Sequence, residues 1–433
     1  MTRHFCAWAV SAALFLSASP TQADDLIQIY QQALSSDPVL LQARADLDAS
    51  YQTLGQSRAN LLPQINASLG YGNTFKAIQP SQEVSGYQAG LSLSQSIYDH
   101  ANYVSLDITK QQISQAELRF EQQKQGLIQR VAKAYFDVLF AEDSLAFTRA
   151  NTRAIQQQLE QTQQRFSVGL TAITDVHEAQ AQFDLAKANE INAENALANQ
   201  REALSEITGL THDTLSPLDT QRFSPSMPTP ARADQWVTLA EQSSQALLSD
   251  KLAVEIARQQ IALAKTGHLP SMSLTANLDQ NFGWKGEQNG VSGNLAVQVD
   301  VPIFSGFSVS SQIKQAQYDF AGSQQRLEET HRSLVRSLRN ELNNVSASLS
   351  SIRAFEQSVV SAESALKATE AGFEVGTRTI VDVLDATRRL YNAKQQLADA
   401  RYRYILSSLA LKGAAGSLSE QDIALVNQGL SKR

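Results

Sequence analysis

Apolar residues, interrupted by one threonine, recur every seven positions along two long stretches of the chain that contain no proline. The first series is Val131, Val138, Leu145, Thr152, Leu159 and Phe166, and the second is Leu338, Val345, Ile352, Val359, Leu366 and Phe373. A seven-residue repeat predicts helices that supercoil against neighbouring helices through a narrow apolar seam. A continuous helix over residues 101–166 would be about 100 Å long at about 1.5 Å per residue, which no ordinary globular core requires.

Four shorter segments alternate apolar and polar residues. Their apolar positions are Ile65, Ala67, Leu69 and Tyr71; Tyr87, Ala89, Leu91 and Leu93; Met272, Leu274, Ala276 and Leu278; and Leu295, Val297, Val299 and Val301. This alternation predicts β-strands with one apolar and one polar face. Such strands fit a barrel wall with lipid outside and water inside, with Tyr98 and Phe304 as aromatic residues at the strand ends. A small soluble sheet carried on a helical domain would show the same alternation.

The two halves of the chain repeat each other at a constant offset of 207 residues. The segment that begins at Phe166 shares six of eleven residues with the segment that begins at Phe373, and the Leu-Pro pair that ends at Pro63 recurs at Pro270. Two distant anchors with one offset indicate an internal duplication.

These patterns predict five segments in the chain. They are a signal peptide at 1–23, a first repeat at 24–209 (helix, strand, strand, long helix, helix), a linker at 210–231, a second repeat at 232–414 and a C-terminal tail at 415–433. The signal is indicated by Arg3 before the apolar run 5–16 and by small residues up to Ala23, and the linker by its four prolines. Since Cys6, the single cysteine, lies in the signal, we expect a mature chain without thiol or disulfide.

Sheet closure separates the two interpretations of the strands. Unpaired backbone groups in lipid cost several kcal/mol each, and four strands are too few to enclose a lumen. Several copies of the chain must therefore share one barrel, and three copies would supply twelve strands, which lies within the range of outer-membrane barrels.

Composition disfavours other classes of function. The formal net charge is -7, so we expect no nucleic-acid partner. His177-Glu178 begins like a zinc-protease helix, but Ala181 stands where the second histidine is needed. The sequence therefore predicts no enzyme, no metal site and no cofactor.

Several motifs resemble the TolC family of outer-membrane efflux channels. They are Leu61-Leu62-Pro63-Gln64, Gln95-Ser-Ile97-Tyr98-Asp99, the segment from Gln164 through Val176, and the segment from Val375 through Ala386 with Leu390-Tyr-Asn-Ala-Lys394. The resemblance implies an α plus transmembrane β fold: a homotrimeric channel in the outer membrane whose shared 12-stranded barrel continues into a periplasmic tunnel of antiparallel coiled-coil helices. It also implies a periplasmic adaptor protein and an inner-membrane exporter of the RND, ABC or MFS type as partners, with drugs, bile salts, other detergents and secreted proteins as cargo.

The resemblance assigns three sets of residues to the helix–helix turns. Val168, Gly169, Leu170, Val375, Gly376 and Thr377 would form the periplasmic tip that the adaptor contacts. Asp382 and Asp385 would form the constriction, where a threefold axis would gather six carboxylates into a cation-selective ring. Thr174 and Asp175 would accept hydrogen bonds from Arg378 in a latch that holds the tip shut.

Phe373 also belongs to this latch, at a position where the family uses a tyrosine. The missing hydroxyl predicts a latch weaker by about 1 kcal/mol per protomer.

Two alternatives remain open at this stage. A periplasmic coiled-coil adaptor would also be secreted, but its single hairpin would interrupt a soluble β domain. A trimeric fibrous adhesin would lack the duplicated strand pairs. Fractionation distinguishes them, because only a channel would be recovered from the outer membrane as a trimer.

Overall fold

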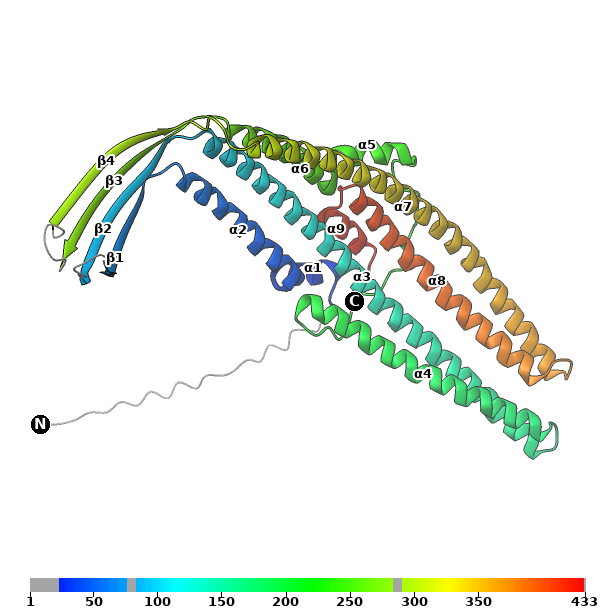
Figure 1. Cartoon of the computed structure of the whole chain (residues 1–433). Helices are drawn as coiled ribbons and strands as arrows, with labels where there is room; N and C mark the ends of the chain where they lie inside the picture. Colours follow the sequence, from blue (N-terminus) through cyan, green and yellow to red (C-terminus); the bar gives the residue numbers. More distant parts are fainter. Residues whose placement is uncertain (1–22, 76–82, 283–289, 432–433) are drawn as a thin grey trace, which may run out of the picture.

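The computed structural model describes residues 23–75, 83–282 and 290–431. The first half contains α1 (Leu26–Ser36), α2 (Pro38–Ala59), β1 (Gln64–Phe75), β2 (Glu83–Tyr98), α3 (His100–Ser167) and α4 (Ile173–Thr208). The second contains α5 (Ala233–Ser243), α6 (Gln245–Thr266), β3 (Ser271–Phe282), β4 (Gly290–Asp300), α7 (Ser308–Glu374) and α8 (Ile380–Ala414), and α9 (Glu420–Gln428) follows. The strands lie at one end of an elongated molecule, and the hairpins α3–α4 and α7–α8 end at the other (Figure 1).

The predicted duplication is confirmed element by element. The helices α1 and α5, the helices α2 and α6, and the strands β1 and β3 begin and end at positions that differ by the same 207 residues. The segment boundaries derived from the sequence stay a prediction, and all of the signal segment except Ala23 lies outside the described residues.

Each half begins with two helices where the sequence indicated one. Asp37 and Ser244 break the helix at equivalent positions, with ψ values of 116° and 113°. The Asp37 carboxylate accepts the N–H of Leu40 at 2.8 Å, and the Ser244 hydroxyl accepts that of Leu247 at 3.5 Å. Both side chains therefore act as N-caps, which explains the break.

The four strands form one antiparallel sheet in the order β1-β2-β3-β4. Ile65 lies opposite Leu93, and Ala276 lies opposite both Leu93 and Leu295. The predicted apolar positions therefore share one face across all four strands. That face is open, as Leu69 with 89% of its surface exposed illustrates.

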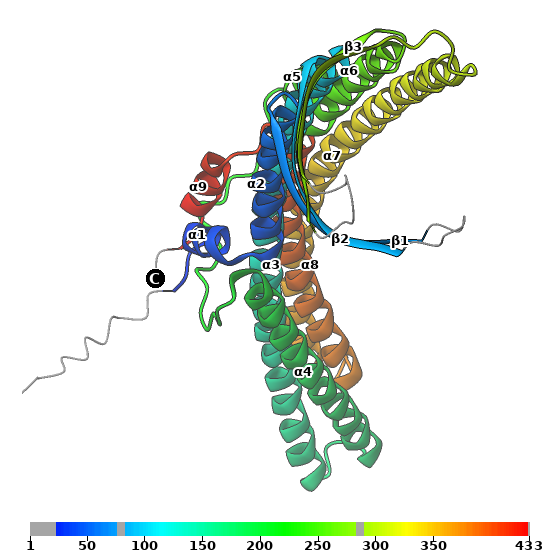
Figure 2. The same cartoon turned by 60° about the vertical axis from the view of Figure 1, so that its left-hand side comes forward.

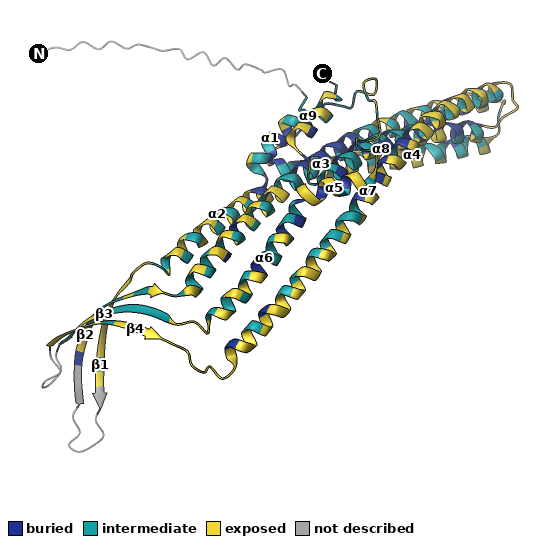
Figure 3. Cartoon of the chain, turned by 90° about the horizontal axis from the view of Figure 1, so that it is seen from above, coloured by how far each residue is buried: buried dark blue, intermediate teal, exposed yellow. Residues whose placement is uncertain are grey.

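The helices α3 and α7 are the two long rods that the heptad pattern predicted, with 68 and 67 residues. The helix α3 packs against both α4 and α8. A buried cluster that includes Tyr135 and Phe136 lies midway along α3, beside α1 and α9, which project from one flank of the rods (Figure 2). Colouring by burial places most dark-blue residues in this middle region rather than along the strands (Figure 3).

The middle region also contains a polar contact between α3 and α8. The Tyr402 hydroxyl donates a 2.7 Å hydrogen bond to the Asp143 carboxylate. Burial raises the pKa of Asp143, although the hydrogen bond from Tyr402 opposes this shift.

None of the helices in the described ranges combines the length and the apolar character needed to cross a membrane.

Candidate functional site at the two hairpin tips

The turn between α3 and α4 reverses the chain with a left-handed glycine. Gly169 has φ of +77°. Its N–H donates to the carbonyl of Phe166 at 2.9 Å, and the N–H of Leu170 donates to the carbonyl of Arg165 at 2.8 Å. This pair of bonds is a Schellman motif, which satisfies the last carbonyls of α3 and needs a residue that tolerates positive φ.

The turn between α7 and α8 has the same backbone. Gly376 has φ of +80°, its N–H donates to the carbonyl of Phe373 at 3.1 Å, and the N–H of Thr377 donates to that of Gly372 at 2.8 Å. The recurring Val-Gly pair is thus explained by a backbone requirement that both halves share.

Large apolar side chains at both turns point into solvent. Val168 and Leu170 expose 69% and 76% of their surface, and Val375 exposes 75%. These side chains lie in turns that are fixed by hydrogen bonds. Each hairpin, whose end is visible in Figure 1, therefore presents exposed apolar side chains on a fixed turn.

The two helices that follow the turns begin differently. At the start of α8, Oδ2 of Asp382 accepts hydrogen bonds from the backbone N–H and the hydroxyl of Thr379, both at 2.9 Å, and the Thr379 oxygen accepts the N–H of Asp382 at 3.3 Å. These bonds, the backbone amide first, lower the pKa of Asp382. At the start of α4 the cap position is Ala172, whose side chain forms no capping bond.

The second predicted constriction residue, Asp385, lies one turn further along α8. Its Oδ1 accepts a 2.7 Å hydrogen bond from Arg388, and the two side chains are 40% and 54% exposed. The sequence reasoning missed both partners of the acids, although a Thr-x-x-Asp spacing and an Asp-x-x-Arg spacing indicate such contacts on a helix.

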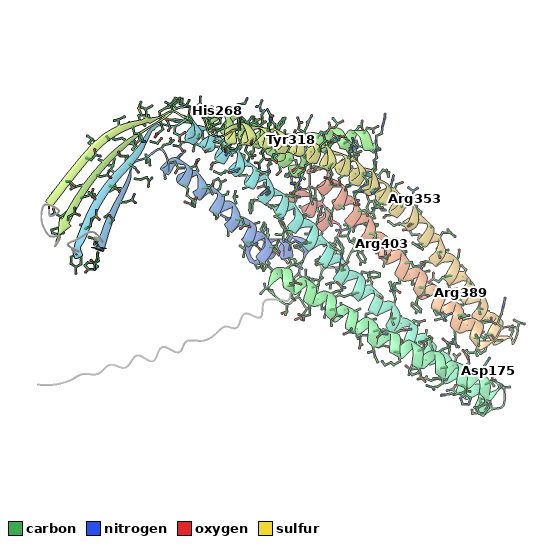
Figure 4. The ribbon with its side chains drawn as sticks, viewed as in Figure 1. Asp175, His268, Tyr318, Arg353, Arg389 and Arg403 are labelled. Atoms are coloured by element: carbon green, nitrogen blue, oxygen red, sulfur yellow. The ribbon has the colours of Figure 1, made fainter. Side chains whose placement is uncertain are left out.

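The predicted latch residues lie on the two neighbouring turns. In the described chain, Asp175 accepts a hydrogen bond from the Thr171 hydroxyl and forms no ion pair with Arg378. The exposed residue Thr174 lies beside Asp175 on α4, and Asp175 marks the tip of the α3–α4 hairpin (Figure 4). The link between Arg378 and these residues stays a prediction.

A different contact joins the two hairpins. The guanidinium carbon of Arg165 lies 4.5 Å from the centroid of the Phe373 ring. Phe373 also packs against a buried cluster that includes Leu159 on α3 and Ile380 on α8. A phenyl ring at this position therefore has two contacts that need no hydroxyl, which the sequence alone did not show.

No group of three or more His, Cys, Asp or Glu residues is arranged to hold a metal ion within the described ranges.

The architecture is shared with solved outer-membrane channels. The outer membrane channel CmeC of Campylobacter jejuni superposes with a TM-score of 0.78 over 100% of this chain and 98% of its own, at 16% identity. CusC superposes with a TM-score of 0.78 over 91% of this chain and 92% of its own, at 17% identity. These structures establish the fold class.

Curated relatives cover nearly the whole chain. The outer membrane protein TolC of Vibrio cholerae serotype O1 is 47% identical and covers 97% of both chains. The TolC protein of Escherichia coli strain K12 is 43% identical over 96% of this chain and 87% of its own. The alkaline protease secretion protein AprF of Pseudomonas aeruginosa is 30% identical over 98% of this chain and 91% of its own.

The family described as outer membrane efflux protein matches residues 29–210 and 236–417, one match in each half. The chain belongs to this family. The predicted resemblance, fold class and outer-membrane location are thereby confirmed, and the adaptor alternative is not favoured.

Proposed function

We propose that three copies of this chain form one outer-membrane channel with a periplasmic helical tunnel. The channel gives passive exit to substrates of tripartite efflux pumps and type I secretion systems, among them drugs, bile salts and secreted proteins. Among the relatives, TolC and the protease secretion protein AprF carry names that fit these two roles. The proposed partners are a periplasmic adaptor and an inner-membrane exporter of the RND, ABC or MFS type.

The sheet is the single observation that carries this proposal. Its edges in the described chain are β1 and β4, and one face exposes apolar residues on every strand, for example Ile65, Leu91, Leu278 and Leu295. Lipid tolerates such a face but not open edges, so β4 of one copy must pair with β1 of the next. Three copies close twelve strands into a barrel.

The proposal is tested on protein purified from native outer membranes. We expect a trimer that forms stable single channels in planar lipid bilayers and co-purifies with an inner-membrane exporter. A monomer in detergent and in nanodiscs, with no conductance, would contradict it.

Asp382 and Asp385 are proposed to line the constriction and make the closed channel cation-selective. The hydrogen bonds from Thr379, which lower the pKa of Asp382, favour its ionised form and so support this role. We expect the double substitution Asp382→Ala with Asp385→Ala to abolish block by a trivalent cation in single-channel recordings. Unchanged block would remove these residues from the constriction.

The adaptor is proposed to contact the two hairpin turns through six residues: Val168, Gly169, Leu170, Val375, Gly376 and Thr377. Their exposure on fixed turns supports this role. Gly169→Cys and Gly376→Cys should crosslink to a co-expressed adaptor. The matched control is Gly55→Cys on the exposed surface of α2, which should not crosslink. Equal labelling at all three positions would contradict a specific tip contact.

Arg378, Thr174, Asp175 and Phe373 are proposed to latch the tip in the closed state. Thr174 and Asp175 lie in the first turn of α4, Arg378 precedes α8, and the contact between Arg165 and Phe373 brings these two hairpin ends together. Arg378→Ser should raise closed-state conductance. The control is Arg353→Ser, at an exposed arginine about 20 residues before the end of α7 (Figure 4), which should not raise it. If both variants conduct like the parent channel, the latch assignment is wrong.

A further inference from the structure

The first three turns of α8 carry four charges on the face that does not pack. The buried side of this segment consists of Ile380, Val383, Leu384, Ala386, Thr387 and Leu390. At about 100° per residue, Asp382, Asp385, Arg388 and Arg389 all point away from that side. Arg389 lies close to the tip of the α7–α8 hairpin (Figure 4). Around the helix, Arg388 and Arg389 lie about 60° and 40° from Asp385, so both arginines face the same space as Asp385.

Both aspartates already have close partners on their own helix. Arg388 donates to Asp385 at 2.7 Å, and Thr379 holds Asp382 with two bonds at 2.9 Å. The charge of Asp385 is thus compensated in part by a guanidinium on its own helix, whereas Asp382 is held by neutral donors.

We infer that Arg388 is a selectivity-determining residue of the constriction and that the proposed carboxylate ring is a mixed ring of acids and guanidinium groups. This inference rests on the proposed role of Asp382 and Asp385. Per protomer, the two acids are balanced by Arg388 and Arg389, so the segment 382–389 has a formal charge of zero. The constriction is consequently less selective for cations than a ring of aspartates alone, and multivalent cations bind to it less tightly.

Distances along the helix support compensation rather than two separate rings. Along the axis, Arg388 and Arg389 lie about 4.5 and 6 Å from Asp385 at about 1.5 Å per residue. Both separations are shorter than the screening length of about 8 Å at physiological ionic strength, so an ion at the level of Asp385 also senses the arginines. Asp385 and Arg388 are in direct contact, so their electrostatic fields cancel more completely than those of the other charges in the segment.

The inference is tested by reversal potentials of single channels in a KCl gradient. Removing one guanidinium near a narrow pore shifts the energy of a monovalent ion by about 1 kcal/mol, which corresponds to about fivefold. Because the energies of cations and anions shift in opposite directions, Arg388→Gln should raise the cation-to-anion permeability ratio about 25-fold and lower the half-blocking concentration of hexaamminecobalt(III). Asp385→Asn should shift the ratio toward anions by a similar factor.

The control is Arg403→Gln on the same helix. Arg403 also forms an ion pair with an aspartate, Asp399, at 2.7 Å, but it lies far from the tip (Figure 4). Its substitution should leave the permeability ratio unchanged. Because Arg388 and Arg403 are both exposed, both variants should assemble like the parent protein.

Two outcomes overturn the inference in different ways. If Arg388→Gln leaves the reversal potential unchanged while Asp382→Ala with Asp385→Ala alters it, the acids form the constriction and Arg388 does not modulate it. If neither variant has an effect, the constriction lies elsewhere, and the proposed role of Asp382 and Asp385 is wrong as well.

Discussion

The two hairpin tips share the same backbone conformation but carry different side chains. Gly169 and Gly376 adopt nearly the same φ, +77° and +80°, and both turns are closed by the same pair of hydrogen bonds. After the glycine, the first tip continues with Leu170, Thr171 and Ala172, whereas the second continues with Thr377, Arg378 and Thr379. The backbone requirement is therefore separable from side-chain function: the turn has to be kept in both halves, while the residues around it are free to differ.

The largest expected effect comes from breaking the shared feature. Gly169→Ala and Gly376→Ala should each destabilise their turn by about 1–2 kcal/mol, because an L-residue is strained in the left-handed region. Hydrogen exchange of the tip amides in the intact channel measures this local opening.

The matched control for the glycines is Gly126→Ala within α3, where an added Cβ meets no atom within 4 Å. Alanine there should stabilise the protein by about 0.5–1 kcal/mol. Equal destabilisation at all three glycines would show that the turns have no special backbone requirement.

The second effect exchanges the helix caps between the tips. Thr379→Ala removes the capping box at the start of α8 and should cost about 1 kcal/mol, whereas Ala172→Ser should supply a missing cap to α4 and stabilise it by a similar amount. Exchange protection of the first turn of each helix should move in opposite directions. A fall in protection in both helices would contradict the assigned difference.

The third effect concerns the contact between the hairpins. Arg165→Gln removes the cation from the face of Phe373 and should weaken the association of the two tips by about 0.5–1 kcal/mol. A double-mutant cycle with Phe373→Leu, measured as closed-state conductance, isolates the interaction energy between Arg165 and the Phe373 ring. A coupling energy of zero would mean that the ring and the guanidinium are merely adjacent.

The smallest effect depends on pH. Because the pKa of Asp382 is lowered in the folded protein, its capping contribution is fully present above the ordinary aspartate pKa and is lost as the pH falls through the lowered value. Acidification in that range should open the first turn of α8 more than that of α4, after correction for intrinsic exchange rates. Asp382→Asn should remove the difference, and a difference that persists in this variant would assign it to another group.

Much of the fold followed from periodicity. The heptads predicted α3 and α7, and strict alternation predicted all four strands, because both patterns reflect which side of an element is buried or faces lipid. The break at Asp37 was missed, since a single capping carboxylate leaves the apolar pattern on either side unchanged.

The candidate site was less accessible to sequence reasoning. The turns were located by their glycines, but the contact between Arg165 and Phe373 joins residues more than two hundred positions apart, and no local pattern reveals it. The ion pair between Asp385 and Arg388 is local, yet its importance depends on which face of α8 is left unpacked, and only the structure shows that.

The buried cluster holds α3 near its middle, so the half of the helix that leads to the turn is a long arm anchored at one end. Tyr135 and Phe136 are fully buried about halfway along a helix of 68 residues, and the arm from there to the turn is about 48 Å long at about 1.5 Å per residue. Tilting this arm by about 10° would carry its end sideways by about 8 Å. A small change of packing at the buried cluster would thus be enough to move the turn by about the width of a small solute.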